Sequence, residues 1–282
     1  MKAKRKRIGT KAQIRALKER ERRTATAIFL AFILLIVAFS AYFTYTSLNP
    51  SPNQTINPAS SQLKATIVDH LSLTFPNQTF IQTATTMLEQ AGYTVDYHPG
   101  EEVTVEFYRN LPTGENNLII LRVHSALAIN EGGQELGFVD LFSSELYSTT
   151  RYVSEQLTDQ VSKCMFSTRG PAYFGISPPF VQRSMKGTFK NAIIILMGCD
   201  GLAYTTLARA FIQRGAKTCI GWNGLVLASH TDRAATNLLQ HLILEKQTIG
   251  QAVENAMNEV GADPTYRSLL TYYPLEVRDQ TM

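Results

Sequence analysis

The sequence predicts an α/β fold in which helices cover both faces of a mostly parallel sheet, giving a three-layer α/β/α sandwich. Short apolar runs of strand length alternate with longer segments of helical spacing along most of the chain after residue 64. Glycines directly follow two of the helical segments, where a helix-ending residue is expected. Strands joined through helices run parallel, because each connection crosses one face of the sheet before the chain enters the next strand.

Strands and helices alternate in the first half of the expected fold. The predicted strands are residues 65–70 (ATIVDH), 93–97 (YTVDY) and 117–124 (NLIILRVH). The predicted helices are about residues 79–90, which Gly92 ends, and residues 103–109, which lead into the third strand in spite of their β-branched side chains.

The second half repeats this order around Cys199. Residues 191–199 (NAIIILMGC) predict a buried strand that ends at the cysteine, and residues 203–214 predict a helix that Gly215 ends. Residues 217–222 (KTCIGW) predict the next strand. The order strand, helix, strand is a βαβ unit, for which a right-handed crossover is expected.

His124 and Cys199 each stand at the C-terminal end of one of these predicted strands. In open α/β sheets, ligands and reactive groups gather at this edge, because the side chains beyond the strand ends leave the core. A thiol beside an imidazole supplies a nucleophile and a general base. A single cysteine is more often a small buried apolar residue, so it is the paired placement that indicates catalysis.

The residues around Cys199 resemble those of a caspase-like (clan CD) cysteine peptidase domain, and are most similar to its CHAT and gingipain-like branches. The resemblance is strongest over residues 191–261 and rests on the stretches IILMGCDG, ARAFIQRGAK, IGW, TDRAATNLL and IGQAVENA, in that order. It implies a caspase-like sheet with His124 and Cys199 as a catalytic dyad that needs no cofactor and no metal.

The chemistry of such a dyad suggests an oxyanion hole. It would use the N–H of Cys199 and an N–H near His124 or Ser125, with Gly198 allowing close approach of the substrate. The predicted helix at 203–214 would direct its positive end toward the Cys199 turn and lower the pKa of the thiol.

The resemblance further implies a substrate pocket after the strand that ends at Trp222. Trp222, Asn223 and Asp232 are the candidates for lining the site of the residue before the scissile bond. For Trp222 the alternative is ordinary core packing. For Asp232 the alternative is the N-cap of a helix over residues 233–245.

Two features depart from the family pattern. Ser125 stands where the family usually has a glycine after the catalytic histidine, and residues 125–190 form a long insertion between the two catalytic strands. Within the insertion, residues 137–150 predict a hairpin, 152–163 a short polar helix and 168–187 a loop. We expect the insertion to cover the crevice at the strand ends.

The chain before the expected peptidase domain (65–282) predicts a membrane anchor. Residues 1–24 form a basic tail, with 11 Lys or Arg and 2 Asp or Glu side chains between positions 2 and 23, and Ala25 to Leu48 carry no charge. A helix of that length spans about 36 Å and crosses a hydrocarbon core of roughly 30 Å. The positive-inside rule then places the N-terminus in the cytoplasm and the domain outside the cell membrane, as a single-pass signal anchor. A cleaved signal peptide is the alternative, because residues 38–41 (AFSA) are small enough for a cleavage site.

Residues 49–64, rich in Pro, Ser and Asn, predict an exposed stalk. The stalk holds the glycosylation sequon of Asn53, and a second sequon at Asn77 opens the first predicted helix. The chain has three cysteines, so at least one is unpaired, and Cys164 and Cys219 either form a disulfide or remain free thiols. Free thiols are favoured, because Cys219 lies within an apolar strand where it is expected to be buried.

Composition and motifs exclude several other functions. Apart from the basic tail, the chain carries 16 basic and 21 acidic side chains, so nucleic-acid binding is not expected. The sequence has no GxGxxG, no P-loop and no Cys/His cluster with metal-ligand spacing. The predicted function is therefore a membrane-anchored extracytoplasmic cysteine endopeptidase acting on protein or peptide substrates. Two alternatives remain: a non-catalytic sensor or scaffold that keeps the fold, and a cysteine transpeptidase acting on surface proteins.

Overall fold

The computed structural model of the chain describes residues 62–167 and 169–282. The predicted basic tail, membrane span and most of the stalk, with Asn53, lie outside the described residues. Within the described ranges, no helix combines the length and the apolar character that crossing a membrane requires.

The main sheet has six strands in the order β10-β9-β8-β3-β1-β2. All neighbouring pairs are parallel except β9 and β10, which are antiparallel. The sheet is therefore mostly parallel, as the sequence predicts, with an antiparallel edge strand that the sequence analysis did not anticipate. Its strands are β1 (Lys64–Asp69), β2 (Thr94–Pro99), β3 (Leu118–Arg122), β8 (Ile193–Leu196), β9 (Thr218–Trp222) and β10 (Leu270–Tyr273).

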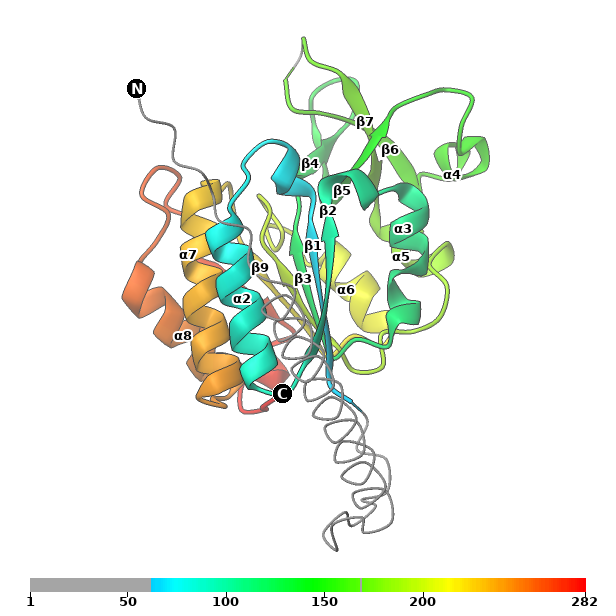
Figure 1. The fold of residues 1–282 in the computed structure, drawn as a ribbon. Helices are drawn as coiled ribbons and strands as arrows, with labels where there is room; N and C mark the ends of the chain where they lie inside the picture. The colour runs from blue at the N-terminus through cyan, green and yellow to red at the C-terminus, as the bar shows by residue number, and fades with distance from the viewer. Residues whose placement is uncertain (1–61, 168) are drawn as a thin grey trace, which may run out of the picture. The chain divides into compact units, whose positions relative to one another are not determined.

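Helices cover both faces of this sheet (Figure 1). Ile120 and Ile195 point into one apolar cluster, while Ile119 and Ile194 point into the other, as strand alternation requires. Three helices pack in the first cluster: α2 (Gln78–Gln90), α7 (Ala228–Leu239) and α8 (Ile249–Val260). Three pack in the second: α3 (Val105–Asn110), α5 (Pro178–Arg183) and α6 (Thr206–Gln213). The three-layer α/β/α arrangement follows.

The insertion after His124 forms a second sheet, with the strand order β4-β5-β7-β6 and only antiparallel pairs. One face of this second sheet packs in the same apolar cluster as α3, α5 and α6, through side chains such as Val139, Leu141 and Phe174. Its elements are β4 (Ser125–Ile129), β5 (Glu135–Leu146), α4 (Val153–Leu157), β6 (Val161–Met165) and β7 (Ala172–Ile176).

The predictions for the insertion were largely wrong. The hairpin expected at 137–150 is one long strand, β5, which pairs with β4 on one side and with β7 on the other. The helix expected at 152–163 is the short α4 followed by β6, and the loop expected at 168–187 contains β7 and α5. Pro178 stands at the start of α5, where the missing N–H of proline costs no helical hydrogen bond, so proline here begins a helix.

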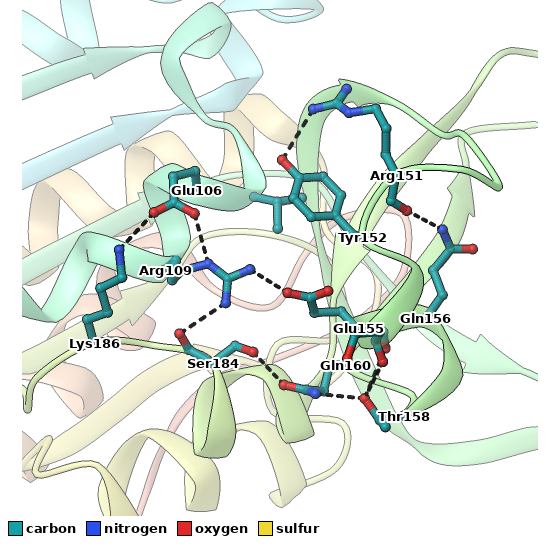
Figure 2. Close-up of polar contacts among 12 residues, drawn as sticks. Glu106, Arg109, Arg151, Tyr152, Glu155, Gln156, Thr158, Gln160, Ser184 and Lys186 are labelled. Atoms are coloured by element: carbon teal, nitrogen blue, oxygen red, sulfur yellow. Dashed lines mark hydrogen bonds and ion pairs between the residues drawn. The ribbon is translucent and has the colours of Figure 1, made fainter.

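Polar contacts fasten the insertion to α3, as Figure 2 shows. Arg109 on α3 forms ion pairs with Glu106 on the same helix at 2.8 Å and with Glu155 on α4 at 2.7 Å. Arg109 also donates to the carbonyl oxygen of Ser184, near the end of the insertion, at 3.3 Å. The side chains of Arg109 and Glu155 are only 16% and 19% exposed, so solvent screens their attraction incompletely. The inserted sheet is thus held in one position on the main domain.

Candidate active site

The ends of neighbouring parallel strands bring the two candidate residues to one edge of the main sheet. In the register of β3 with β8, Leu121 lies beside Leu196. His124 follows closely on the end of β3, and Cys199 follows closely on the end of β8. The prediction that these two strands are adjacent and parallel is confirmed.

A side-chain hydrogen bond joins the two segments directly. The Ser125 hydroxyl donates to the carbonyl oxygen of Cys199 at 2.5 Å, and the Met197 N–H donates to the Leu121 carbonyl at 2.9 Å. Ser125 is also the first residue of β4, so the strand that opens the insertion starts at this contact. Ser125, which directly follows His124, therefore ties this segment to the backbone of Cys199.

Gly198 lies where no side chain fits. A Cβ atom at this position would be 2.4 Å from the carbonyl oxygen of Val123 and 2.3 Å from the Ser125 hydroxyl oxygen. The prediction that Gly198 makes room for a substrate therefore needs correction, because the space beside it is taken by the end of β3 and the start of β4. The glycine allows these two segments to approach each other.

His124 is held by one hydrogen bond and a group of rings. The Thr74 hydroxyl lies 2.8 Å from His124 Nε2, which leaves Nδ1 as the nitrogen for exchanging a proton with a thiol. Thr74 follows η1 (His70–Leu73), the turn at the end of β1. Four rings have their centroids within 4.5 to 6.0 Å of the imidazole, those of His70, Phe75, Phe142 and Phe166.

Burial among these rings keeps the imidazole neutral. It lowers the pKa of His124 to about 4, with a further contribution from the positive charge of Arg122. His70 is only 1% exposed, its Nδ1 has no hydrogen-bond partner within the described residues, and burial lowers its pKa to about 4 as well. Both imidazoles are therefore bases that stay unprotonated at neutral pH.

Sequence reasoning assigned no role to His70. The structure places its ring edge against His124, with centroids 5.6 Å apart, because β1 and β3 are neighbours that end at the same edge of the sheet. The signal was present in the sequence: His70 ends the apolar run ATIVDH, just as His124 and Cys199 end theirs.

The Cys199 thiol is half-buried and donates to the carbonyl oxygen of Val226 at 3.6 Å. Burial raises the pKa of this thiol, hydrogen bonding with the backbone of Val226 acts in the opposite direction, and the negative charges of Asp200 and Asp263 raise the pKa further. The predicted lowering of the pKa by a helix is not found. The helix α6 begins only at Thr206, seven residues after Cys199 along the chain, whereas a helix dipole acts mainly within its first turn.

Asp232 lies in a buried ion-pair cluster. Arg122, fully buried, donates to both carboxylate oxygens of Asp232 at 2.7 and 2.8 Å and to Asp69 at 2.6 Å. Both alternatives that the sequence offered for Asp232 are corrected by this pairing. Asp232 is only 5% exposed and both of its carboxylate oxygens accept from Arg122, so it does not line an open pocket. It lies inside α7, which begins at Ala228, so it is not the N-cap of the helix.

The same cluster reaches the segment that holds His124. Arg122 Nη2 donates to the carbonyl oxygen of Phe75 at 2.8 Å, and Phe75 is the neighbour of Thr74 along the chain. Arg122 thus positions, through the backbone, the threonine whose hydroxyl contacts His124.

The other two pocket candidates have structural contacts. Trp222 is fully buried, and its indole N–H donates to the Thr231 hydroxyl at 2.9 Å, which matches the core-packing alternative. Asn223 is exposed, and its side-chain oxygen accepts from the Leu269 N–H at 2.8 Å. Asn223 therefore fastens the loop before β10, and the structure does not bring it together with Trp222 and Asp232 into one pocket.

The remaining predicted residues are also placed. The Asn77 side chain caps α2 by accepting from the Phe80 N–H, and its amide nitrogen donates to Asp232 at 2.8 Å. That nitrogen is the atom a glycan would use, so glycosylation here would break the contact with Asp232. Cys164 and Cys219 are both buried free thiols. Within the described ranges, no group of three or more His, Cys, Asp or Glu side chains is arranged to hold a metal ion.

Comparison with known proteins gives a structural likeness. No protein-family model matches the chain, and no curated protein matches it. Among solved structures, that of the Arg-specific cysteine proteinase gingipain R (RGPB) is similar, with a TM-score of 0.43 and 13% sequence identity. The match covers 69% of this chain and 41% of the gingipain chain. At this TM-score and identity, the likeness carries no weight in assigning a function.

Proposed function

We propose that the protein is a cysteine peptidase that uses Cys199 as nucleophile and His124 as general base, with protein or peptide substrates. The observation that carries the proposal is the hydrogen bond from Ser125 to the Cys199 carbonyl, at 2.5 Å, between the ends of two adjacent parallel strands. It ties the residue after His124 to the backbone of Cys199, which supports an imidazole and a thiol at the same sheet edge, the arrangement that nucleophilic catalysis by cysteine needs.

The proposed reaction begins from a neutral pair, because the pKa of His124 is about 4 and that of Cys199 is raised. The thiol proton moves to His124 as sulfur attacks the peptide carbonyl carbon. The imidazolium then gives this proton to the leaving amine as the C–N bond breaks, and an acyl-enzyme remains. His124 next takes a proton from a water molecule as the water oxygen attacks the thioester carbon. The C–S bond then breaks, the acid product leaves, and the imidazolium returns its proton to the sulfur, which restores the thiol. The N–H of Cys199 is the proposed oxyanion donor.

One observation favours a second candidate, a non-catalytic binding module with the same fold. Burial and, after it, the negative charges of Asp200 and Asp263 raise the pKa of the Cys199 thiol, whereas catalytic thiols usually lie in electropositive surroundings. If the protein is instead a peptidase, its thiol is protonated at rest, and the dyad has to rely on proton transfer within the enzyme–substrate complex.

The two candidates are separated by digestion of a peptide library. The full-length protein in phospholipid nanodiscs would be compared with its Cys199→Ala, His124→Ala and Cys164→Ala variants. We expect the first two variants to lose cleavage to a similar extent, because dyad members act as a unit, and the Cys164→Ala control to retain it. Cleavage by Cys199→Ala equal to that of the wild type would refute the peptidase. If neither the wild type nor any variant cleaves a peptide, the binding module is the better description.

The location outside the cell rests on the sequence alone. We propose that Ala25 to Leu48 anchors the protein in the membrane, with the basic tail in the cytoplasm. Protease added to intact cells should then remove the domain after residue 49 and leave the tail protected. A mature chain that begins near residue 42 would instead identify a cleaved signal peptide.

A further inference from the structure

Two exposed phenylalanines lie beside the proposed general base. Of the four rings around the half-buried His124 imidazole, those of His70 and Phe142 are buried. The other two, Phe75 and Phe166, are 54% and 43% exposed, and their centroids lie 6.0 and 4.5 Å from that of His124. A single apolar side chain on a protein surface needs no explanation, but two beside one candidate catalytic residue form a patch that a ligand can cover.

The two rings come from different parts of the fold, and each is held in place. Phe75 lies just after η1 at the end of β1, and its carbonyl oxygen accepts from the buried Arg122 at 2.8 Å. Phe166 directly follows β6 in the insertion and stacks on Phe142, with centroids 4.8 Å apart and planes 15° apart. A side chain whose position is fixed before binding loses little conformational entropy when a ligand covers it. The main domain and the insertion thus each supply a fixed apolar ring beside His124.

The chemistry of the proposed reaction decides which part of a substrate meets these rings. His124 gives its proton to the leaving amine, so the nitrogen after the scissile bond must come within roughly 3 Å of the imidazole. The side chain of the residue that carries this nitrogen begins only two bonds further on. It therefore reaches rings whose centroids lie 4.5 and 6.0 Å from that of the imidazole.

We infer that Phe75 and Phe166 bind an apolar side chain, aliphatic or aromatic, of the substrate residue after the scissile bond, and so determine specificity on the leaving-group side. The inference rests on the proposed function. Neither ring carries a charge or a hydrogen-bonding group, so burial of apolar surface is the main gain. A cation over an exposed ring gains less than an apolar side chain gains by burial. A carboxylate would meet the negative ring faces and the charges of Asp200 and Asp263 near Cys199.

Amino-acid amides, which mimic the leaving portion of a substrate, test the inference without requiring turnover. Their binding to the full-length Cys199→Ala protein in nanodiscs would be titrated by saturation-transfer NMR at neutral pH, with empty nanodiscs subtracted. The probes are the α-amides of phenylalanine, leucine, glycine, lysine and aspartic acid, which differ only in the side chain. We expect the first two to bind about tenfold more tightly than the others, because covering the rings removes apolar surface from water. Glycinamide or lysinamide binding as tightly as leucinamide would overturn the inference.

Matched variants locate the site. Phe75→Ser and Phe166→Ser should each weaken leucinamide binding, while Leu275→Ser should leave it unchanged. Leu275 is 67% exposed and lies on η5 (Leu275–Val277), which follows the distant edge strand β10. Phe166→Arg should shift the preference toward the aspartic acid amide, a result that loss of packing alone does not produce. Undiminished leucinamide binding to folded Phe75→Ser and Phe166→Ser proteins, or no gain for the acidic probe with Phe166→Arg, would contradict the assignment.

Acyl transfer separates this inference from the proposed function. With the wild type and a peptide that it cleaves, an added amide competes with water for the acyl-enzyme. Its nitrogen attacks the thioester carbon, a peptide bond forms as the C–S bond breaks, and His124 carries the amine proton to the sulfur. We expect leucinamide to divert more acyl-enzyme than glycinamide, and Phe166→Ser to reduce this difference. Cleavage without any such preference would refute the inference alone. Preferential binding of leucinamide without cleavage of any peptide would refute the peptidase, and with it the role in specificity, and would leave only an apolar binding site.

Discussion

The hydroxyl of Ser125 is hydrogen-bonded to the carbonyl oxygen of Cys199, at 2.5 Å, across the ends of two parallel strands. The residue after the candidate base is thereby tied to the candidate nucleophile. Gly198 makes the approach possible, since a side chain there would occupy the position of the Ser125 hydroxyl and of the Val123 carbonyl. The geometry of the site is thus a product of backbone packing at the sheet edge.

Adding a methyl group at this point should disturb the sheet edge. We expect Gly198→Ala to lower the free energy of unfolding by about 1–3 kcal/mol, the usual cost of overpacking. Ser125→Ala should not rescue it, because the Val123 carbonyl oxygen would remain 2.4 Å from the new methyl group. Urea unfolding of both variants measures this, with Gly132→Ala in an exposed turn as the control. A Gly198→Ala protein as stable as the wild type would show that the edge can relax.

The hydroxyl of Thr74 should set the orientation and tautomer of His124. Replacing it with the isosteric valine removes a hydrogen bond at 2.8 Å, which contributes about 1 kcal/mol. We expect Thr74→Val to reduce kcat/KM about fivefold to tenfold, since 1.4 kcal/mol corresponds to a factor of ten. Thr74→Ser keeps the hydroxyl and should stay near the wild type. The ¹⁵N spectrum of His124 provides a readout independent of turnover, and identical spectra for the two variants would contradict the orienting role.

Asp232→Asn should act on stability and leave substrate preference alone. The carboxylate faces Arg122, which is fully buried, so its neutralisation leaves a buried positive charge partly unpaired. Breaking such a pair costs about 3–5 kcal/mol. The measurement is the free energy of unfolding beside that of Asp279→Asn, an exposed carboxyl, which should be unchanged. A stable Asp232→Asn protein with altered cleavage preference would restore the pocket assignment.

The two neutral histidines make stability depend on pH on the acid side. His70 and His124 have folded pKa values of about 4, below the ordinary 6.5, so between these limits the unfolded chain binds more protons than the folded one. Stability is therefore complete above pH 6.5 and is lost as the pH falls toward 4. Asp140, with a raised pKa of about 6, acts in the opposite sense over roughly pH 6 to 4, because there the folded chain binds the extra proton.

His70→Phe isolates one of these contributions. Phenylalanine keeps a ring beside His124 and Phe166 and removes one titrating group. We expect the loss of stability on acidification to become shallower by up to about 1.4 kcal/mol per pH unit, which is the value of one proton. Urea unfolding at several pH values between 7 and 4.5 measures the slope. An unchanged slope would mean that His70 takes up its proton equally in both states.

The sequence by itself determined five strands of the main sheet and the two candidate residues at their ends. Apolar runs such as 117–124 and 191–199 form strands because they bury side chains on both faces, and the residues just after them leave the core at one edge. Local patterns were sufficient here, because the spacing of apolar residues and the glycines that end helices each involve only a few residues that are neighbours along the chain. Gly92 and Gly215 both adopt positive φ, as helix ends of this kind require.

Tertiary structure decided what no local pattern contains. Arg122 and Asp232 are 110 residues apart in the sequence, and only their burial between β3 and α7 pairs them and removes Asp232 from any pocket. The insertion became a sheet because β5 pairs with strands on both sides, while its glycines and prolines suggested turns and loops. The pKa of Cys199 likewise depends on which charges the fold places beside it. Long-range pairing and burial control these features, because the free energy of a charge or a strand edge depends on neighbours that are distant along the chain.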